Sequence, residues 1–484
     1  MRKSRRQFLE DSMIAAVAAF SVGPARRALG DEETQSTSPN ERLGVAVVGV
    51  RGRGQSHLRA FAERRDTEVI YVCDPDKAIG AQRVEAVAQR QGRRPQFVAD
   101  MRTVFDDKRV DIVSIATPNH WHALASIWAM QADKDVYVEK PVSHNVAEGR
   151  RMVQVTRRRG RICQTGCQIR SMKAMRDAIQ YLHDGKLGEV TLGRALTFKA
   201  RGSIGPVGRY DVPTHIDYNL WLGPAPRAPL TRPRFHYDWH WQWAYGNGDF
   251  GNVGIHRVDL ARWGLRLNTL ANSVISYGGR FGYEDAGQTP NTQVTLFDFG
   301  NKAIVSEVRN LESPQYKDAR IVIFEGSEGY LLMNQYDRGV AFDTSGKAVA
   351  HFDGDFEDHF ANFVAAVRSR KPQELRAEIL EGHLSSGLCH LGNISHRLGR
   401  PASVKEIRGR LESVQSAENV LDTFDRTCRH LADHNIDLDR TPLHLGPLLA
   451  FDPRSETFVD SPQANELLTR QYRGPFVVPE ADEI

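Results

Sequence analysis

A glycine-rich turn followed by a distant aspartate has the residue types and spacing that bind a pyrophosphate and a ribose. Gly49-Val-Arg-Gly-Arg-Gly54 follows an apolar run at 43–48, and Asp74 lies 20 residues beyond Gly54. Glycine permits a tight turn and lets backbone N–H groups approach phosphate at the positive end of a helix. The middle glycine of G-x-G-x-x-G is replaced by Arg51, with Gly52 one position later. A tight strand–helix turn without a ligand is therefore an alternative for this segment alone.

Asp74 favours the dinucleotide interpretation because it ends the next apolar run. A carboxylate at that point can accept hydrogen bonds from the ribose diol. It also repels a 2′-phosphate, so we expect NAD rather than NADP, although Arg51 and Arg53 could still accommodate that phosphate.

The elements that must position these residues alternate between strands and helices. Apolar runs typical of strands buried on both faces lie at 43–48, 68–73, 110–116, 135–138 and 162–164. Helical patterns separate them, which predicts a doubly wound parallel sheet of the α/β class. Ligands bind at the carboxyl ends of such strands. We therefore expect the loops at 49–54, 117–122 and 139–141 to share one crevice with Asp74.

Beyond residue 166 the pattern changes to longer alternating segments, such as residues 292–299. This is typical of a mainly antiparallel sheet with one covered face. The expected organisation is a nucleotide-binding domain at 43–165, an α+β domain with an open-faced sheet at 166–400, and a C-terminal extension at 401–484. The open face of the sheet is the expected homo-oligomer surface.

The N-terminal segment resembles a twin-arginine export signal. Ser4-Arg5-Arg6-Gln7-Phe8-Leu9 precedes a short apolar run at 13–22 and small residues at 28–30. This predicts a signal at 1–30, a linker at 31–42 and export to the periplasm by the twin-arginine (Tat) machinery as a folded protein. The run is too short to span a bilayer, so no stable membrane insertion is expected after signal removal. An uncleaved anchor and a chance basic terminus are the alternatives.

Charge and cysteine content narrow the function classes further. The 64 Lys and Arg exceed the 60 Asp and Glu by four. Removal of residues 1–30 takes away six bases and two acids, which leaves 58 of each. A balanced chain has no long-range field to attract nucleic acid. The five cysteines contain no C-x-x-C pair, so neither a metal site nor a disulfide framework is expected.

Four motifs together resemble the Gfo/Idh/MocA oxidoreductases, which include glucose–fructose oxidoreductase and inositol dehydrogenase. They are the glycine turn, Thr117-Pro-Asn-His-Trp-His122, Glu139-Lys140-Pro141 and Gly248-Asp-Phe-Gly-Asn-Val-Gly-Ile-His256-Arg-Val-Asp259. The resemblance covers about residues 43–400. It implies a Rossmann domain, an open-faced sheet domain and NAD-dependent oxidation of a CH–OH group in a sugar or polyol. The cofactor-binding residues expected are Gly49, Arg51, Gly52, Gly54, Asp74, Thr117, Pro118, Asn119, His122, Glu139 and Lys140.

The resemblance also implies that Lys140 and His256 work beside the nicotinamide. We expect His256 to accept the hydroxyl proton and Lys140 to polarise the oxygen, with Pro141 helping to aim Lys140. Many relatives carry aspartate where this chain has Asn252, and an amide orients an imidazole without stabilising its charged form. Asp259 is the alternative source of that charge. By themselves, Lys140 could be a surface lysine and His256 a core histidine.

A ring-rich segment, Arg234-Phe-His-Tyr-Asp-Trp-His-Trp-Gln-Trp243, precedes the histidine motif. Rings with polar tips are what a sugar pocket uses, although core packing would also explain them. The predicted substrate contacts are Asp238, His240, Trp241 and Asp259.

Export would separate the enzyme from a replenished cofactor pool, so tightly bound NAD is expected. Two alternatives remain open. One is a redox-neutral glycoside-processing enzyme, in which oxidation permits elimination of a leaving group before reduction. The other is a sugar-binding protein that retains NAD without catalysis.

Overall fold

The computed structural model describes residues 41–314, 320–414 and 416–484. The expected signal at 1–30 lies outside the described residues, as does all but the end of the linker at 31–42. No helix of the described ranges combines the length and apolar character needed to cross a membrane.

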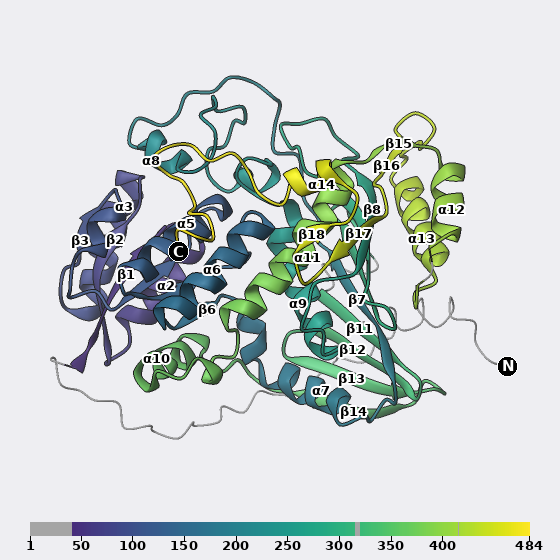
Figure 1. Ribbon diagram of the computed structural model, residues 1–484, viewed down its shortest axis with the longest axis horizontal. Helices are drawn as coiled ribbons and strands as arrows, with labels where there is room; N and C mark the ends of the chain where they lie inside the picture. The colour runs from purple at the N-terminus through teal and green to yellow at the C-terminus, as the bar shows by residue number, and fades with distance from the viewer. Residues whose placement is uncertain (1–40, 315–319, 415) are drawn as a thin grey trace.

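The first sheet is the predicted parallel one, with six strands in the order β3-β2-β1-β4-β5-β6. Its strands are β1 (Leu43–Val48), β2 (Thr67–Cys73), β3 (Gln96–Val98), β4 (Ile112–Ile115), β5 (Asp135–Val138) and β6 (Cys163–Thr165). The helices between them are α2 (Arg53–Ala62), α3 (Lys77–Gln91), α4 (Arg102–Phe105), α5 (Asn119–Gln131) and α6 (Val146–Arg159). This layered body occupies the left of Figure 1.

Strand β1 shows why its sequence is apolar at every position. Val45 and Val47 pack in one cluster with α2, α3 and α10 (His359–Ser369), whereas Ala46 and Val48 pack in another with α5 and α6. Alternate side chains of a strand point to opposite faces, so a sheet covered on both faces needs apolar residues throughout.

A reciprocal capping pair fixes the start of α6. The Asn145 Oδ1 accepts the Glu148 backbone N–H at 2.9 Å, and the Asn145 Nδ2 donates to the Glu148 carboxylate at 3.0 Å. A side chain that satisfies an unpaired N–H at a helix start fixes the point where the helix begins.

The second sheet has twelve strands and is mainly antiparallel, with one parallel pair, β7 and β10. Its longer strands are β7 (Val190–Phe198), β8 (Ser273–Gly279), β9 (Thr292–Asp298), β10 (Ala303–Arg309), β11 (Arg320–Gly326), β12 (Gly329–Gln335), β13 (Arg338–Asp343) and β14 (Ala348–Asp353). Short strands complete it: β15 (Arg400–Ala402), β16 (Leu443–Leu445), β17 (Leu449–Asp452) and β18 (Thr457–Phe458).

Helices cover this sheet unevenly. Its first face packs against α7 (Lys173–His183), α9 (Ile255–Gly264) and α11 (Ile379–Arg397). On the second face, α12 (Val404–Glu412) and α13 (Val420–Asp433) pack against β7–β10 through an apolar cluster that includes Ile407 and Phe424. The C-terminal extension therefore covers part of the face that was expected to be open, and the homo-oligomer expected there stays a prediction.

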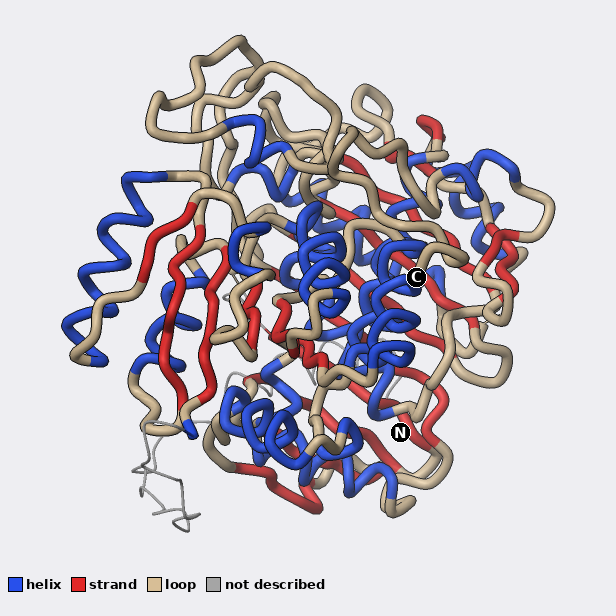
Figure 2. The backbone as a smooth tube through the Cα atoms, turned by 60° about the vertical axis from the view of Figure 1, so that its left-hand side comes forward, coloured by secondary structure: helices blue, strands red, loops and turns tan. Residues whose placement is uncertain are grey.

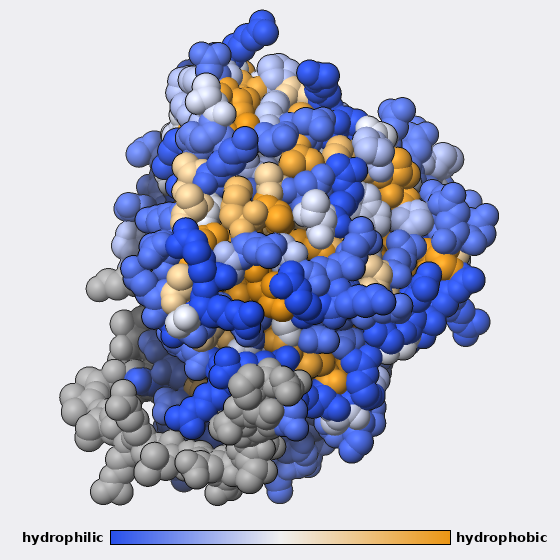
Figure 3. All heavy atoms as spheres, turned by 90° about the vertical axis from the view of Figure 1, so that its left-hand side faces the viewer, coloured by the Kyte–Doolittle hydropathy of each residue, from blue (hydrophilic) through white to orange (hydrophobic). Residues whose placement is uncertain are grey.

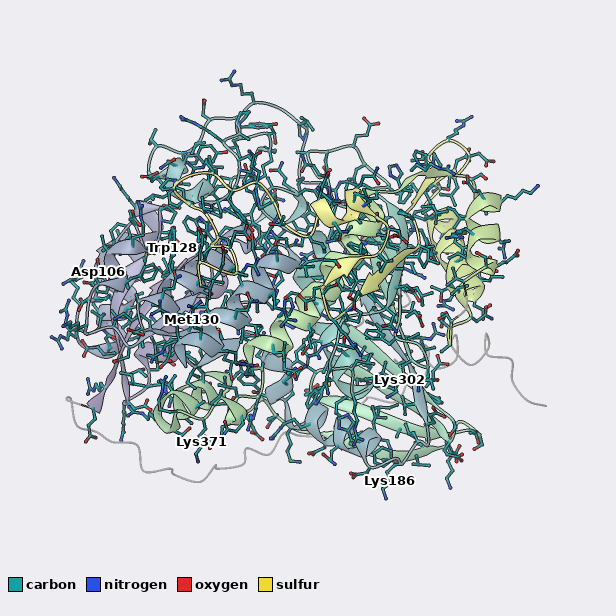
Figure 4. The ribbon with its side chains drawn as sticks, in the orientation of Figure 1. Asp106, Trp128, Met130, Lys186, Lys302 and Lys371 are labelled. Carbon is teal, nitrogen blue, oxygen red and sulfur yellow. The ribbon has the colours of Figure 1, made fainter. Side chains whose placement is uncertain are left out.

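After α14 (Pro462–Glu466), the final segment at 467–484 runs back to the first domain, as the yellow trace in Figure 1 shows. The Phe476 ring lies 5.4 Å from Trp121 and 6.3 Å from Trp128, both on α5. Figure 4 labels Trp128 on that helix, beside the yellow segment.

The connection between β7 and α9 is mostly irregular and lies at one end of the molecule, where Figure 2 shows a mass of loop. It contains the short helix α8 (Tyr218–Leu222) and a 3-10 turn, η3 (Asp238–Trp241). The face toward α3 and β3 is largely hydrophilic, with apolar side chains showing between charged ones (Figure 3).

Candidate active site

The loops that follow β1, β2, β4 and β5 meet at one cavity of about 420 Å³. This is the crevice that the topology of a parallel sheet predicts. Nearly all predicted cofactor residues line it: Gly49, Arg51, Gly52, Asp74, Thr117, Pro118, Asn119, His122, Glu139 and Lys140. Asn252 and His256, from the second domain, line the same cavity.

The glycine turn is built by close backbone contacts. Gly49 has φ +79°, and a Cβ there would lie 2.7 Å from the Thr117 nitrogen. A Cβ on Gly54 would lie 1.9 Å from the Gly49 carbonyl oxygen, so this glycine permits packing beneath the turn and does not itself line the cavity. Gly52 has φ +51° and open space around the position of a Cβ. The turn thus leaves room where a phosphate would approach the N-terminus of α2.

Asp74 is buried and well placed for a ribose. Its Oδ2 accepts the Val50 N–H at 2.8 Å, and its Oδ1 accepts the Asp76 N–H at 2.9 Å. Burial raises the pKa of Asp74 to about 6, against the opposing effect of these hydrogen bonds. A carboxylate offers about four lone-pair sites, so acceptors remain for hydroxyl groups.

The loops after β4 and β5 are tied together by His122, whose ring nitrogens lie 2.6 Å from the Pro141 carbonyl oxygen and 2.8 Å from that of Thr117. The Thr117 Oγ1 is buried and has no hydrogen-bond partner among the described residues. An unpaired buried hydroxyl on a cavity wall is a group that a ligand would satisfy. Together with the open glycine turn and Asp74, it fits a dinucleotide.

Glu139 and Lys140 are neighbours in sequence, but their side chains bind residues of different domains. Glu139 accepts hydrogen bonds from Arg53 at 3.0 Å and from His57 at 3.1 Å, both within the first domain. Burial alone would raise the pKa of Glu139, but the His57 hydrogen bond and the Arg53 charge hold it well below its usual range. Glu139 is therefore a buried anion that fixes the end of β5.

Lys140 precedes a cis peptide bond to Pro141, and its side chain reaches across to the second domain. Its Nζ donates to the Asn252 backbone oxygen at 2.6 Å and to the Asn252 Oδ1 at 3.3 Å. The Asn252 Nδ2 in turn donates to Asp249 at 3.2 Å. Burial lowers the pKa of Lys140, and the nearby Glu139 charge only partly opposes this.

Asn252 belongs to a π-helical turn, η4 (Phe250–Gly254), which runs directly into α9. Such turns are frequent at functional sites because they redirect side chains at the start of a helix. This one places both the Asn252 oxygen and the His256 ring at the cavity.

His256 is buried, and its Nδ1 has no hydrogen-bond partner in the described part of the chain. Burial lowers the pKa of His256 well below its ordinary value, and the charges of Lys140 and Arg257 add to this effect. The imidazole is therefore neutral at physiological pH, which is the form that can accept a proton.

The predicted substrate residues divide into two groups. His240 lines the cavity, but Asp238, Trp241 and Asp259 do not. Asp238 is buried, and its Oδ2 accepts a hydrogen bond from the Arg234 Nε at 2.7 Å. Trp241 packs with Ile204 and Ala286. In a 3-10 turn, residues three apart share a side, so His240 and Tyr237 face the cavity while Asp238 and Trp241 face inward.

Asp259 is committed to a structural ion pair. Both carboxylate oxygens accept Arg170 N–H groups at 2.8 Å, and Oδ1 also accepts the Ser385 hydroxyl at 2.6 Å. The sequence hypothesis was that Asp259 stabilises the charged form of His256. In the structure, Asp259 is instead paired with Arg170.

Several lining residues were not predicted. They are mainly aromatic or apolar and come from α5, α8, η3 and the loop before η3: Trp121, Leu220, Trp221, His236, Tyr237 and Trp239. The ring-rich run signalled the last three, but only the phase of the 3-10 turn distinguishes them from their buried neighbours. Trp221 is brought to the wall by tertiary contacts, including the hydrogen bond of His120 to its carbonyl oxygen at 3.0 Å.

Comparison with known proteins agrees with this arrangement. Residues 43–167 match the oxidoreductase family's NAD-binding Rossmann fold, and residues 198–431 match its C-terminal alpha/beta domain. The levoglucosan dehydrogenase of Pseudarthrobacter phenanthrenivorans is 26% identical over 324 residues, covering 62% of this chain and 75% of that protein.

Two further similarities have either a shorter matched length or a lower identity. Glycosyl hydrolase family 109 protein 1 of Shewanella sp. (strain ANA-3) is 27% identical over 182 residues, which span 37% of this chain and 39% of that protein. The WlbA dehydrogenase of Bordetella pertussis, solved with NADH and UDP-GlcNAcA, superposes with a TM-score of 0.55 at 19% identity, covering 74% of this chain and 97% of that one. The latter shows a shared fold. With both of its domains matched by the family, the chain belongs to the NAD-binding Gfo/Idh/MocA oxidoreductases.

Proposed function

We propose that this protein is an NAD-dependent oxidoreductase that acts on a secondary alcohol of a sugar, glycoside or polyol. The proposal depends on one observation: Lys140 and His256 line the same cavity as Gly49 and Asp74. Each domain contributes one of the two groups that alcohol oxidation needs, a donor to the oxygen and an acceptor for its proton.

The cofactor would be held by the first domain. The open turn at Gly52 accommodates the pyrophosphate, Asp74 accepts ribose hydroxyls, and the unpaired Thr117 hydroxyl offers a further contact. Bound NAD supplies the hydride acceptor for the substrate carbon. The Asp74 carboxylate disfavours a 2′-phosphate in the same place, which supports NAD over NADP.

His256 is the proposed proton acceptor. Burial and the Lys140 charge lower its pKa, which favours the neutral ring, the form that can accept a proton. His256 lines the cavity, and its buried Nδ1 lacks a partner among the described residues.

Lys140 is the proposed donor to the substrate oxygen. Its two hydrogen bonds to Asn252 fix the ammonium at the boundary between the domains. A positive charge beside the substrate oxygen stabilises the negative charge that develops as its proton leaves.

The sugar assignment rests on the second wall and on the relatives. Tyr237, Trp239 and His240 combine flat apolar faces with polar tips at the cavity, which suits a molecule with C–H faces and hydroxyl edges. The relative matched over most of its length is named for levoglucosan, a sugar derivative.

The test is a sugar and polyol panel, assayed for NADH formation in a single turnover with the wild type, Lys140→Ala and His256→Ala. We expect each variant to lose about 10²–10⁴-fold in rate, the usual contribution of a positioned acid or base. Lys186→Ala and His351→Ala are matched controls, because both residues are exposed on the second domain; Figure 4 labels Lys186 at its far edge. Full turnover by Lys140→Ala would instead favour an NAD-retaining binding protein.

A second candidate is a redox-neutral glycoside-processing enzyme, favoured by the match to the family 109 glycosyl hydrolase. The same pair of residues would assist oxidation of the sugar by bound NAD. Elimination of the leaving group and addition of water to the resulting double bond would precede reduction by the NADH formed. Release of an aglycone from a glycoside without net NADH formation would select this candidate over the first.

We also propose that the protein is exported to the periplasm through the Tat machinery and assembles as a homo-oligomer through the remaining open face of the second sheet. The support for export is the Arg5-Arg6 motif with its apolar run and small residues. A protein that leaves the cytoplasm folded can carry its cofactor with it.

A further inference from the structure

Tyr237 has an unusual backbone for a large side chain. Its φ is +67°, a region that bulky residues rarely adopt, yet half of the residue is exposed and it lines the cavity. Such backbone conformations persist where the surrounding structure imposes them, and they cluster at binding sites. Because Tyr237 is both exposed and part of the cavity wall, it lies at the cavity mouth.

A clamp holds the Tyr237 ring in this position. The Arg201 Nη1 donates to the tyrosine hydroxyl at 3.1 Å, and Arg201 also pairs with the buried Asp249 at 2.9 Å. The guanidinium lies 5.8 Å from the Tyr237 ring and 5.4 Å from the Trp241 ring. Single exposed rings are common on proteins, but a clamped ring has little conformational freedom to lose when a ligand binds.

The wall continues from Tyr237 toward the reacting lysine. The His240 ring lies 4.7 Å from the Tyr237 ring and stacks on Trp239 at 3.6 Å. Burial lowers the pKa of His240 to about 3, and the charges of Lys140 and Arg201 contribute to that shift. His240, Tyr237 and Lys140 all line the same cavity.

We propose that Tyr237 forms a second saccharide subsite, so that the substrate is a glycoside or oligosaccharide with one ring beside Lys140 and His256 and the adjoining ring stacked on Tyr237. The inference rests on the proposed function and specifies its substrate class. A monosaccharide would fill the inner part of the cavity and leave the clamped ring without a partner.

The ring can be removed without disturbing the backbone. Glycine adopts positive φ as readily as negative, so Tyr237→Gly removes the ring and relieves the strained backbone. Tyr237→Phe keeps the ring and loses only the Arg201 hydrogen bond. Val207→Gly, in the same loop, is the matched control because Val207 is 70% exposed and is not part of the cavity wall.

The experiment compares D-glucose, D-galactose and D-mannose with disaccharides and methyl glycosides built from them. Single-turnover NADH formation and calorimetric binding in the presence of NAD are measured for each. We expect a disaccharide to have the higher kcat/KM in the wild type, and Tyr237→Gly to lower that value about tenfold more than the value for the matching monosaccharide, mainly through KM. Tyr237→Phe should recover most of the difference.

Equal losses for mono- and disaccharides in Tyr237→Gly would overturn the subsite, as would a loss confined to NAD affinity, which would place the ring over the cofactor. If no sugar yields NADH with the wild type, the oxidoreductase proposal fails instead. The binding arm then still decides the subsite, through the presence or absence of a disaccharide preference that depends on Tyr237.

Discussion

At the scale of single residues, Asp249 explains why Asn252 stands where an aspartate is expected. The Asn252 amide donates its N–H to Asp249 at 3.2 Å and turns its oxygen toward Lys140. A carboxylate at position 252 would lie against the Asp249 carboxylate, and like charges that close disfavour ionisation of both. This chain therefore keeps the negative charge one step farther from Lys140, behind a neutral amide.

Removal of that charge should shift the pH dependence of the reaction. Asp249 is among the anions that raise the pKa of Lys140 against the larger effect of burial. Asp249→Asn should lower the pKa of Lys140 further, so the loss of kcat/KM at alkaline pH should begin at a lower pH. The measurement is the pH profile of kcat/KM.

Asp285→Asn is the matched control for this variant. Asp285 pairs with Arg280 at 2.7 Å, and its burial resembles that of Asp249 in its pair with Arg201. Both variants should cost stability, since each weakens a buried ion pair, but only Asp249→Asn should move the alkaline limb. If the two variants had the same pH profile of kcat/KM, the role of Asp249 would be structural only.

The sequence predicted that the ring-rich segment lines the cavity, but it predicted the individual lining residues of that segment less well. A run of rings with polar tips indicated a sugar-facing segment, but Asp238 and Trp241 were chosen where Tyr237 faces the cavity. The phase of a four-residue turn depends on tertiary contacts, such as the Arg234 ion pair of Asp238, that local pattern does not encode.

At the scale of elements, buried strands were predictable because a sheet covered on both faces requires unbroken apolar runs. Strand β3 was not predicted, since its three residues, Gln96–Val98, form a partly exposed edge. The short strands β15–β18 were not predicted either, because two to four residues are too few to show a periodic pattern. The site loops were predictable from topology alone, as ends of neighbouring parallel strands.

The final segment supports the cavity wall from outside. Phe476 packs on Trp121, and Arg473 donates to the Gly223 carbonyl oxygen at 3.0 Å, just after α8. Phe476→Ala should destabilise the protein by about 3 kcal/mol, the usual cost of deleting a buried ring, and should accelerate NAD release. Thermal unfolding and a cofactor-release assay measure the two effects.

Val477→Ala tests whether any truncation in this segment has the same result. Val477 is 48% exposed, so its loss should change neither quantity. Faster NAD release from both variants, or from neither, would argue against support of the wall by the Phe476 ring.

At the scale of the whole molecule, the cavity is enclosed by both domains and by the loop between β7 and α9. A dinucleotide held there would contact residues of both domains. We expect protein recovered from the periplasm to carry NAD through purification, as native mass spectrometry would detect. Periplasmic protein that is free of NAD would contradict cofactor transport within the folded chain.

Replacement of both Arg5 and Arg6 by Lys should retain the protein in the cytoplasm.

The bond between Lys140 and Asn252 also limits how a substrate can be gripped. An ammonium group carries three N–H bonds, and the contacts that the structure describes use two of them, on the main-chain and side-chain oxygens of one asparagine. One remains. The lysine thus has one N–H to donate to a substrate hydroxyl. Discrimination among the hydroxyls of a ring must therefore come from how the rest of the ring is seated.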